Sequence, residues 1–445
     1  APSLARGASP PPPPPQLLAR PALAAGSAVA TIAFGTGKGG DVTVDARHIR
    51  VENGASLGAQ ALNNFLGVTT IPEAGGSDSG ETIVRADLIE LVGNSLFNAA
   101  VPSNIANATF GSGNAGSVVV EANNLRIING GTLASSTLIS FIGTLEQPDA
   151  GRGNGGDLTV RVRDSIEVSG VGVGGDLPSP LGPSTGSFGN AGRTRIETGE
   201  LIIRGGGLVN SAALALGDAG SLVVEADYIL IEGQGDSNNL PSQIAASAFS
   251  PPPDIQERLG IPPGISGDTG QVTVIADRID IRDRGQISVQ HDGRGNAGTL
   301  TIDAGIITLT DGAQIRANTA AGIGGNATVL ARSLQLRGDS QVSVEAGSIG
   351  NGGNLTLETD TLALLEDSTI RANAVQGQGG NIAIVSQGLF LGIDSQITAS
   401  SQLGIDGTVQ VERPEVDPGS ELIQLPATVV DPSDSIATGC AADGD

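Results

Sequence analysis

Acidic, basic and imidazole side chains gather in one short stretch of this sequence. They form a candidate polar surface that consists of Asp280, Arg282, Asp283, Arg284, His291, Asp292 and Arg294. Two carboxylates at a fixed separation across a groove could hydrolyse a glycosidic bond. An arginine beside acidic residues could instead serve as the base of a polysaccharide lyase. These residue types therefore define one hypothesis, a polysaccharide-degrading enzyme.

The same stretch also has a structural interpretation. Residues 283–288 read Asp-Arg-Gly-Gln-Ile-Ser, and residues 311–316 read Asp-Gly-Ala-Gln-Ile-Arg, so the candidate residues occupy ordinary positions of a repeated segment. The pattern favours a solvated turn over a catalytic site. The other histidine, His48, has no evident partner. The sequence contains no nucleophile elbow, phosphate-cradling loop or Cys/His cluster, so we expect neither cofactor nor metal.

The elements that must position these residues repeat along the chain. Each unit contains a glycine-rich turn, and its last glycine is called the marker glycine below. The marker glycines are Gly40, Gly80, Gly116, Gly156, Gly192, Gly220, Gly270, Gly298, Gly325, Gly353, Gly380 and Gly407. The last five intervals are 28, 27, 28, 27 and 27 residues by subtraction. Such regularity is typical of solenoid proteins.

Apolar residues alternate within each unit. The fourth residue after every marker glycine is aliphatic, as in Val44 and Val274, and the second usually is. This period of two predicts a strand with one buried face. Short strands at Ile279–Ile281 and Gln286–Val289 would follow, giving three short strands per unit. No crossover helix fits, so successive units must stack in parallel.

The predicted fold is therefore all-β, a parallel β-helix (β-solenoid) of about twelve rungs, on the order of 60 Å long at ~4.8 Å per rung. Residues 1–35, which include the proline run Pro10–Pro15, are expected to form a disordered leader. Residues 36–413 are expected to form the repeat domain, and residues 414–445 a non-repetitive tail.

Extra residues interrupt the first half of the repeat. They lie around Leu138–Arg152, Val171–Phe188 and Asn239–Ser266, between the third strand and the next marker glycine. We expect them to leave the coil at a single corner. Insertions on one face of a repeat protein are often where it binds.

The glycines and amides of the turns have a structural interpretation. Glycine tolerates positive φ and allows backbones to approach closely. Asn326, Asn354 and Asn381 follow consecutive marker glycines and could form a ladder from rung to rung. Calcium is the competing interpretation, but it requires a nine-residue period with aspartate at a fixed place. Only Asp41 and Asp157 occupy that place here.

Composition narrows the function further. The net charge of −24 argues against a nucleic-acid partner. There is no Trp and only one Tyr, so the aromatic platforms of a sugar cleft are scarce. The single Cys440 cannot staple the fold. No run reaches the 18 or more apolar residues of a membrane-spanning helix, so no transmembrane helix is expected.

Several segments carry a family resemblance. The units Gly153–Val160 and Gly350–Leu357, the segment Asp311–Ile315, and the closing Leu422–Ala427 and Gly439–Cys440 resemble filamentous haemagglutinin-like proteins of cyanobacteria. The resemblance covers about residues 37–440. It implies a right-handed β-helix in a large exoprotein of the two-partner secretion type. The family's Asn-Pro-Asn secretion motifs have no counterpart, because the chain contains no Asn-Pro pair.

The resemblance also implies a location and a role. An outer-membrane transporter would export the chain to the outer cell surface, where adhesion is the expected activity. The sequence therefore predicts an extracellular structural and adhesive rod that is not an enzyme and that attaches to a cell-surface or glycan ligand through repeat faces and corner loops. The alternative is a β-helical polysaccharide-degrading lyase or hydrolase.

Overall fold

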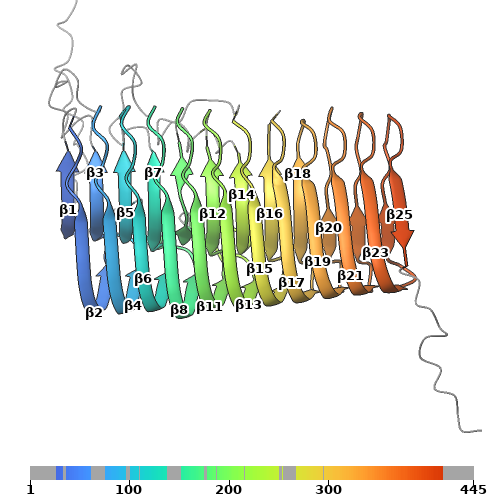
Figure 1. Ribbon diagram of the computed structural model, residues 1–445, viewed down its shortest axis with the longest axis horizontal. Coiled ribbons are helices and arrows are strands. Elements are labelled where there is room, and N and C mark those ends of the chain that lie inside the picture. The colour runs from blue at the N-terminus through green and yellow to red at the C-terminus, as the bar shows by residue number, and fades with distance from the viewer. Residues whose placement is uncertain are drawn as a thin grey trace, which may run out of the picture.

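The chain folds into an elongated all-β coil (Figure 1). The computed structural model describes residues 27–33, 37–61, 76–96, 101–109, 111–137, 152–174, 178–186, 188–214, 216–249, 253, 267–293 and 295–413. Two sheets run the length of the coil, one of 13 strands and one of 12, and every pairing between their strands is parallel. The expected all-β repeat architecture with parallel stacking is confirmed.

The 12-stranded sheet is called the long-strand sheet, because most of its strands have 11 residues. Its strands, in order, are β2 (Val42–Glu52), β4 (Thr82–Val92), β6 (Val118–Ile128), β8 (Leu158–Ser169), β11 (Thr194–Arg204), β13 (Leu222–Glu232), β15 (Val272–Arg282), β17 (Thr299–Leu309), β19 (Asn326–Leu336), β21 (Asn354–Leu364), β23 (Asn381–Leu391) and β25 (Thr408–Glu412).

The 13-stranded sheet is called the short-strand sheet. Its strands are β1 (Ala28–Ala33), β3 (Ser56–Ala61), β5 (Asn104–Thr109), β7 (Thr132–Thr137), β9 (Pro180–Leu181), β10 (Ser184–Thr185), β12 (Leu208–Ala213), β14 (Gln243–Ala248), β16 (Gln286–His291), β18 (Gln314–Thr319), β20 (Gln341–Ser343), β22 (Thr369–Arg371) and β24 (Gln396–Thr398). One long and one short strand make up each regular rung.

The prediction of three strands per rung is wrong, because a regular rung has two. The first two predicted strands are one continuous strand, as in β2, where only the position between Ala46 and His48 drops out of the pairing with β4. The physical reason is that the ladder of hydrogen bonds continues on both sides of a single unpaired position, Arg47 in β2. Even a glycine at that position, Gly199 of β11 or Gly305 of β17, leaves the strand continuous.

One continuous apolar core lies between the two sheets. The fourth residue after the marker glycine is fully buried through the middle of the coil, for example Val84 and Ile302. The short strands contribute residues such as Ile105 and Ile287 from the opposite side. Each buried aliphatic side chain stabilises the coil by about 1.5–3 kcal/mol before the entropy of ordering is subtracted. The predicted alternation of buried and outward residues is confirmed.

The marker glycines are needed for close approach between rungs. A Cβ built on Gly80 would collide with the carbonyl oxygen of Gly40, and one on Gly298 would collide with that of Gly270. Neither Gly80 nor Gly298 has positive φ. Positive φ occurs instead in the short turns after the long strands, for example at Asn53 and Gly54. The two expected roles of glycine therefore belong to two different corners.

Two boundaries differ from expectation. β1 lies within the expected leader of residues 1–35, yet it pairs in parallel with β3, so the coil already includes Ala28–Ala33. Extra residues also leave the coil at two corners rather than one. Residues 93–103, 170–179 and 233–242 connect a long strand to the next short-sheet strand. Most of 138–152 and 239–266 follows a short strand, and residues 138–151, most of 250–266 and the tail 414–445 lie outside the described residues.

Candidate functional site: charged columns and anchored loops

Asp280 and Arg282 point outward from β15 and are engaged by neighbouring side chains. Arg278 donates to Asp280 through Nε at 2.9 Å and Nη2 at 3.0 Å. The hydroxyl of Tyr228 donates to Asp280 Oδ2 at 3.0 Å, and burial together with this bond raises the pKa of Tyr228. Arg282 Nε donates to Glu232 Oε2 at 2.7 Å. These contacts link β13 to β15.

Asp283 and Arg284 form the short turn between β15 and β16. Both have left-handed backbone, with φ of 50° and 64°, and both side chains are exposed. The Arg284 backbone N–H donates to the Asp311 carbonyl of the next turn at 3.0 Å. The turn interpretation of these two residues thus agrees with their placement.

His291 ends β16 and is fully buried. Its Nδ1 accepts the Gly293 N–H at 2.9 Å, so the proton lies on Nε2, which donates to the Gly267 carbonyl at 2.8 Å. Asp292 is exposed and accepts a bond from Gln290 Nε2 at 2.6 Å. Arg294 lies outside the described residues. The sequence cluster is therefore divided among an outer strand face, a turn and the interior.

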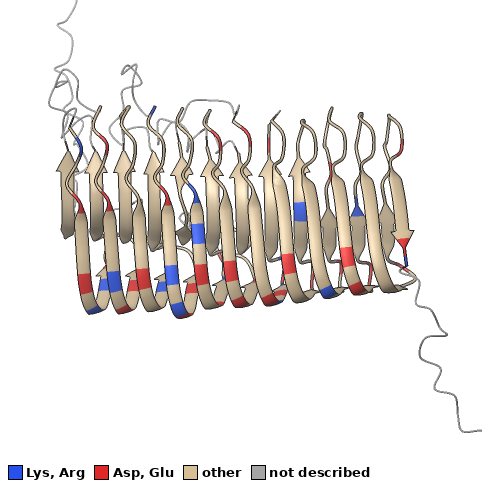
Figure 2. Cartoon of the chain, viewed as in Figure 1, with Lys and Arg blue, Asp and Glu red and all other residues tan. Residues whose placement is uncertain are grey.

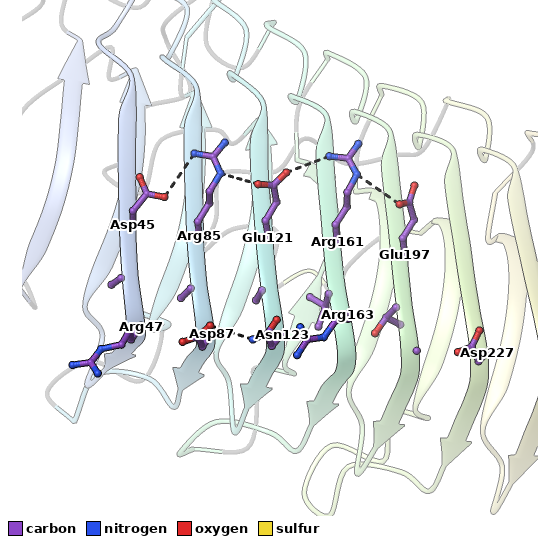
Figure 3. A pocket seen from close by; sticks show the side chains of 16 residues that line it. Asp45, Arg47, Arg85, Asp87, Glu121, Asn123, Arg161, Arg163, Glu197 and Asp227 are labelled. Atoms are coloured by element: carbon purple, nitrogen blue, oxygen red, sulfur yellow. Dashed lines mark hydrogen bonds and ion pairs between the residues drawn. The ribbon is translucent and has the colours of Figure 1, made fainter.

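The structure instead brings charged residues together at the bend of the long-strand sheet. A column of alternating sign runs through Asp45, Arg85, Glu121, Arg161 and Glu197, one residue from each of five successive strands (Figure 3). Arg85 lies 3.7 Å from Asp45 and 2.7 Å from Glu121. Arg161 lies 3.6 Å from both Glu121 and Glu197. This set is called the first charged column.

A second charged column runs beside it through Arg50, Glu90, Arg126 and Glu167. Glu90 accepts Arg50 Nη1 at 3.1 Å and Arg126 Nη1 at 3.3 Å, and Arg126 Nε reaches Glu167 at 3.0 Å. Burial would raise the pKa of Glu90, but hydrogen bonds from His48 and Arg50 outweigh it and hold that pKa below its ordinary value. Burial would likewise raise the pKa of Glu167, but hydrogen bonds from Arg204 and Arg126 outweigh it and hold that pKa below its ordinary value.

The two columns have opposite phase. The strand that contributes Asp45 to the first column contributes Arg50 to the second, and the strand that contributes Arg85 to the first contributes Glu90 to the second. Figure 2 shows the resulting alternation of red and blue along the first strands of the coil. Within each column every charge thus has only opposite charges beside it, and the first column ends where Glu197 lies in register with Glu225 of β13. Shifting the stack by one rung would place like charges together, which is destabilising.

A shallow groove follows the bend beside the first column. Ala46, Ala86 and Ala122 are among its lining residues. Arg47, Asp87, Asn123, Arg163 and Asp227 form a second row beside the first charged column (Figure 3). A second stretch farther along is lined by Asp303, Arg332, Glu358 and Asp360. In the first stretch the charged side chains of the first column are neutralised by one another. The groove is therefore better suited to holding the sheet in register than to concentrating one sign of charge.

Three equivalent loops lie at the corner after the long strands; sequence reasoning did not recognise them as a set, and it placed the one within the expected insertion Val171–Phe188 at the other corner. They are called the anchored loops and comprise residues 93–103, 170–179 and 233–242. Each begins with a glycine of positive φ: Gly93, Gly170 or Gly233. Each ends in an aliphatic-Pro-Ser sequence: Val101-Pro102-Ser103, Leu177-Pro178-Ser179 or Leu240-Pro241-Ser242. That recurring tripeptide was the available sequence signal.

The serine of each tripeptide fixes its loop to two rungs. Ser103 Oγ donates to the Val92 carbonyl at 2.8 Å and accepts the N–H of Gly54 at 3.0 Å. In the second loop Ser179 Oγ makes the equivalent bonds: it donates to the Ser169 carbonyl and accepts the N–H of Gly130, both at 2.9 Å. Ser242 donates to the Glu232 carbonyl at 2.7 Å and accepts the Gly206 N–H at 3.0 Å. All three serines are fully buried.

The anchored loops expose aliphatic side chains to solvent. Leu96 is 73% exposed, Val173 is 66% exposed and Leu240 is 39% exposed. Asn94 joins the first loop to the second, because its side-chain amide donates to the Val173 carbonyl at 3.0 Å and its Oδ1 accepts the Val173 N–H at 2.9 Å. The exposed side chains of Leu96, Val173 and Leu240 are called the tips of the anchored loops below. A binding partner could bury these apolar side chains.

Among the described residues, no group of three or more His, Cys, Asp or Glu side chains could hold a metal ion. Within the same residues, no helix is long and apolar enough to cross a membrane. No protein-family model matches this chain, and no curated protein or solved structure matches it either.

Proposed function

We propose that this protein is the extracellular rod of a secreted adhesin, in which a right-handed coil of about twelve rungs carries the anchored loops as its attachment surface. Parallel strands joined by crossovers are right-handed in nearly all known cases, which supports the handedness. The continuous core supports stiffness, because every rung packs on its neighbours through the same aliphatic columns. The repeat resemblance supports secretion to the cell surface through an outer-membrane transporter.

The observation that carries the proposal is the construction of the anchored loops. Three buried serines hold the loops to the frame, while their tips expose Leu96, Val173 and Leu240. A soluble protein gains no folding stability from exposing aliphatic side chains on braced loops. Burial of the three tips against a cell-surface ligand would contribute about 1.5–3 kcal/mol for each fully buried side chain.

The test measures retention of the purified chain on glycan arrays, whole cells and apolar beads. We expect the triple variant Leu96→Asp/Val173→Asp/Leu240→Asp to lose at least ~10-fold in retention on one of these, because three apolar contacts become charged. The matched control is Ile323→Asp/Ile349→Asp/Ile393→Asp, which alters exposed aliphatic side chains elsewhere on the coil. Equal retention of the two triple variants would contradict the proposal.

The same samples test the enzymatic alternative. A panel of anionic polysaccharides is incubated with the chain, and reducing-sugar release and unsaturated products are measured. Turnover that Asp283→Ala abolishes would replace the adhesin proposal with a polysaccharide-degrading enzyme. We expect no turnover, because Asp283 lies in a turn and the buried His291 is bonded at both ring nitrogens.

A further inference from the structure

The two ends of the coil differ in how they cover the core. At the N-terminal end, Val42 and Val51 of β2 are only 7% and 6% exposed. The residues in the same columns at the C-terminal end are Val409 of β25 and Leu391 of β23, and they are 43% and 52% exposed. On the long-strand side the core is therefore nearly closed at the N-terminal end and open at the C-terminal end, whereas on the short-strand side Val29 of β1, in the column of Leu57, is 60% exposed.

The open end exists because the last rung is incomplete. β25 pairs only with Asn381–Val385 of β23, so no described strand pairs with Leu389–Leu391 on the outer side. β24 likewise has a described partner on one side only, β22. The end surface thus combines apolar side chains, including Val411 at 43% exposure, with unpaired strand edges. Such an edge is a template for one more strand.

The sequence directly after β25 indicates what can supply that strand. Pro414 and Pro418 cannot donate to a ladder, so the prolines stop the parallel pairing of β25. The residues that follow, Glu421-Leu422-Ile423-Gln424-Leu425, have strand character with apolar side chains. The eight residues 414–421 can span at most about 26 Å, which is long enough to return across the end of a coil two sheets thick.

We propose that Leu422–Leu425 of this chain forms a terminal cap that pairs with the open edge and covers Leu389, Leu391 and Val411. The covalent link favours this occupant over a second copy, because a tail tethered to β25 meets the open edge at a high effective concentration. Val42, Ile49 and Val51 at the N-terminal end are covered, so a second copy would find an exposed core column there only at Val29 on the short-strand side. A repeat array also requires a cap to stay soluble.

Hydrogen exchange of the full chain, followed by mass spectrometry, tests the cap. We expect amides of residues 422–425 to exchange at least ~10-fold more slowly than those of residues 433–436 in the same tail. The variant Leu422→Asp/Leu425→Asp should abolish that protection, speed exchange at Leu389–Leu391, increase the fluorescence of an apolar dye and lower the melting temperature. The control Val429→Asp/Val430→Asp adds the same charge to the same tail and should leave all four readouts unchanged.

Three outcomes would overturn the cap. The first is exchange at residues 422–425 as fast as in an unstructured peptide. The second is a Leu422→Asp/Leu425→Asp variant that matches the wild type in melting temperature and dye fluorescence. The third is a light-scattering mass of two chains that Val411→Asp returns to one, which would assign the end to a second copy. None of these variants alters the anchored loops, so the adhesion test is independent.

Discussion

The two halves of the coil share the hydrogen-bond ladders of their turns but differ in the charged side chains of the long-strand sheet. In both halves, amide and carboxylate side chains two residues before the marker glycine join the turns, as where Asn351 accepts the Gln378 N–H at 2.8 Å. Asn114 accepts the Asn154 N–H at 2.9 Å, and Asn154 accepts the Asn190 N–H at 2.9 Å. A second ladder runs one residue after the marker glycine, where Asp41 accepts the Glu81 N–H at 2.8 Å in the first half and Asn326 accepts the Asn354 N–H at 3.1 Å in the second. The charged columns belong to the first half alone among the described residues.

The first half of the coil needs interactions that fix its register more than the C-terminal half does. In the C-terminal half the units are nearly equal in length, so the turns themselves bring equivalent positions together. In the first half the intervals between marker glycines vary, so turn length carries less information. Charged columns of opposite phase and serine-anchored loops supply the missing specificity there, because a one-rung slip would juxtapose like charges and leave buried amides without partners.

The largest predicted effect tests whether the core is packed equally tightly in both halves. Leu201 and Leu334 occupy the same fully buried column, one in each half. We expect Leu201→Ala and Leu334→Ala each to lower the free energy of unfolding by about 2–5 kcal/mol, because each leaves a cavity. Denaturant unfolding measures both. Costs that differ by more than about 2 kcal/mol would show that one half is packed more loosely.

The next effect distinguishes the anchored loops from ordinary turns. Ser242→Ala removes a donor to Glu232 and leaves the Gly206 N–H buried without its partner, so we expect a cost of about 1–3 kcal/mol. Ser340, also fully buried, bonds only the Arg337 carbonyl of its own turn at 2.6 Å, so Ser340→Ala should cost about 1 kcal/mol or less. Thermal unfolding of both variants makes the comparison. An equal cost would remove the special role of the loop serines.

A smaller effect concerns the loss of folding stability at low pH. Because the pKa of Glu90 is lowered in the folded state, its contribution is complete above the ordinary carboxyl pKa and is lost as the pH falls through the lowered value. Glu90→Gln should cost about 1 kcal/mol at neutral pH and flatten the loss of stability in acid, since its partners are half exposed and screened. Glu358 lies between Leu330 and Val385 in register. Glu358→Gln should therefore change stability at neutral pH by less than about 0.5 kcal/mol, and a cost equal to that of Glu90→Gln would contradict the comparison.

The smallest effect extends the first charged column into the other half. Leu330 lies in that column, between Asp303 and Glu358 on adjacent strands. Leu330→Arg should stabilise the coil by about 0.2–1 kcal/mol, and Leu330→Glu should destabilise it by a similar amount. Salt should weaken both effects. A variant series measured by chemical denaturation at low and high salt would decide whether charge alone governs this column.

Much of the fold was accessible from the sequence because parallel stacking places equivalent residues on top of one another. A column such as Val84, Val120 and Val160 is visible as a recurrence before any coordinate is known, and the Asn326 ladder follows from the same logic. The predicted number of strands per rung was wrong, since a single unpaired position such as Arg47 shifts the phase of the apolar alternation without ending the strand.

The candidate site was harder to predict from the sequence than the fold, because residues close in the chain need not share an environment. Proximity along the chain grouped Asp283 with His291, yet a turn and a buried strand end separate their environments. The charged columns join residues 36 to 41 positions apart, such as Arg85 with Glu121 and Arg126 with Glu167. Their partnership appears only after the rungs are aligned in register, and the irregular spacing of the first half obscures that alignment.

The anchored loops also set a distance. They follow β4, β8 and β13, and the intervening strands β6 and β11 lead into short turns, so successive tips stand two strand spacings apart, or about 10 Å. A monosaccharide could touch one tip, whereas an extended polymer about 20 Å long could engage all three at once. Weak individual contacts would then add through a high effective concentration, and selectivity would depend on the length of the ligand.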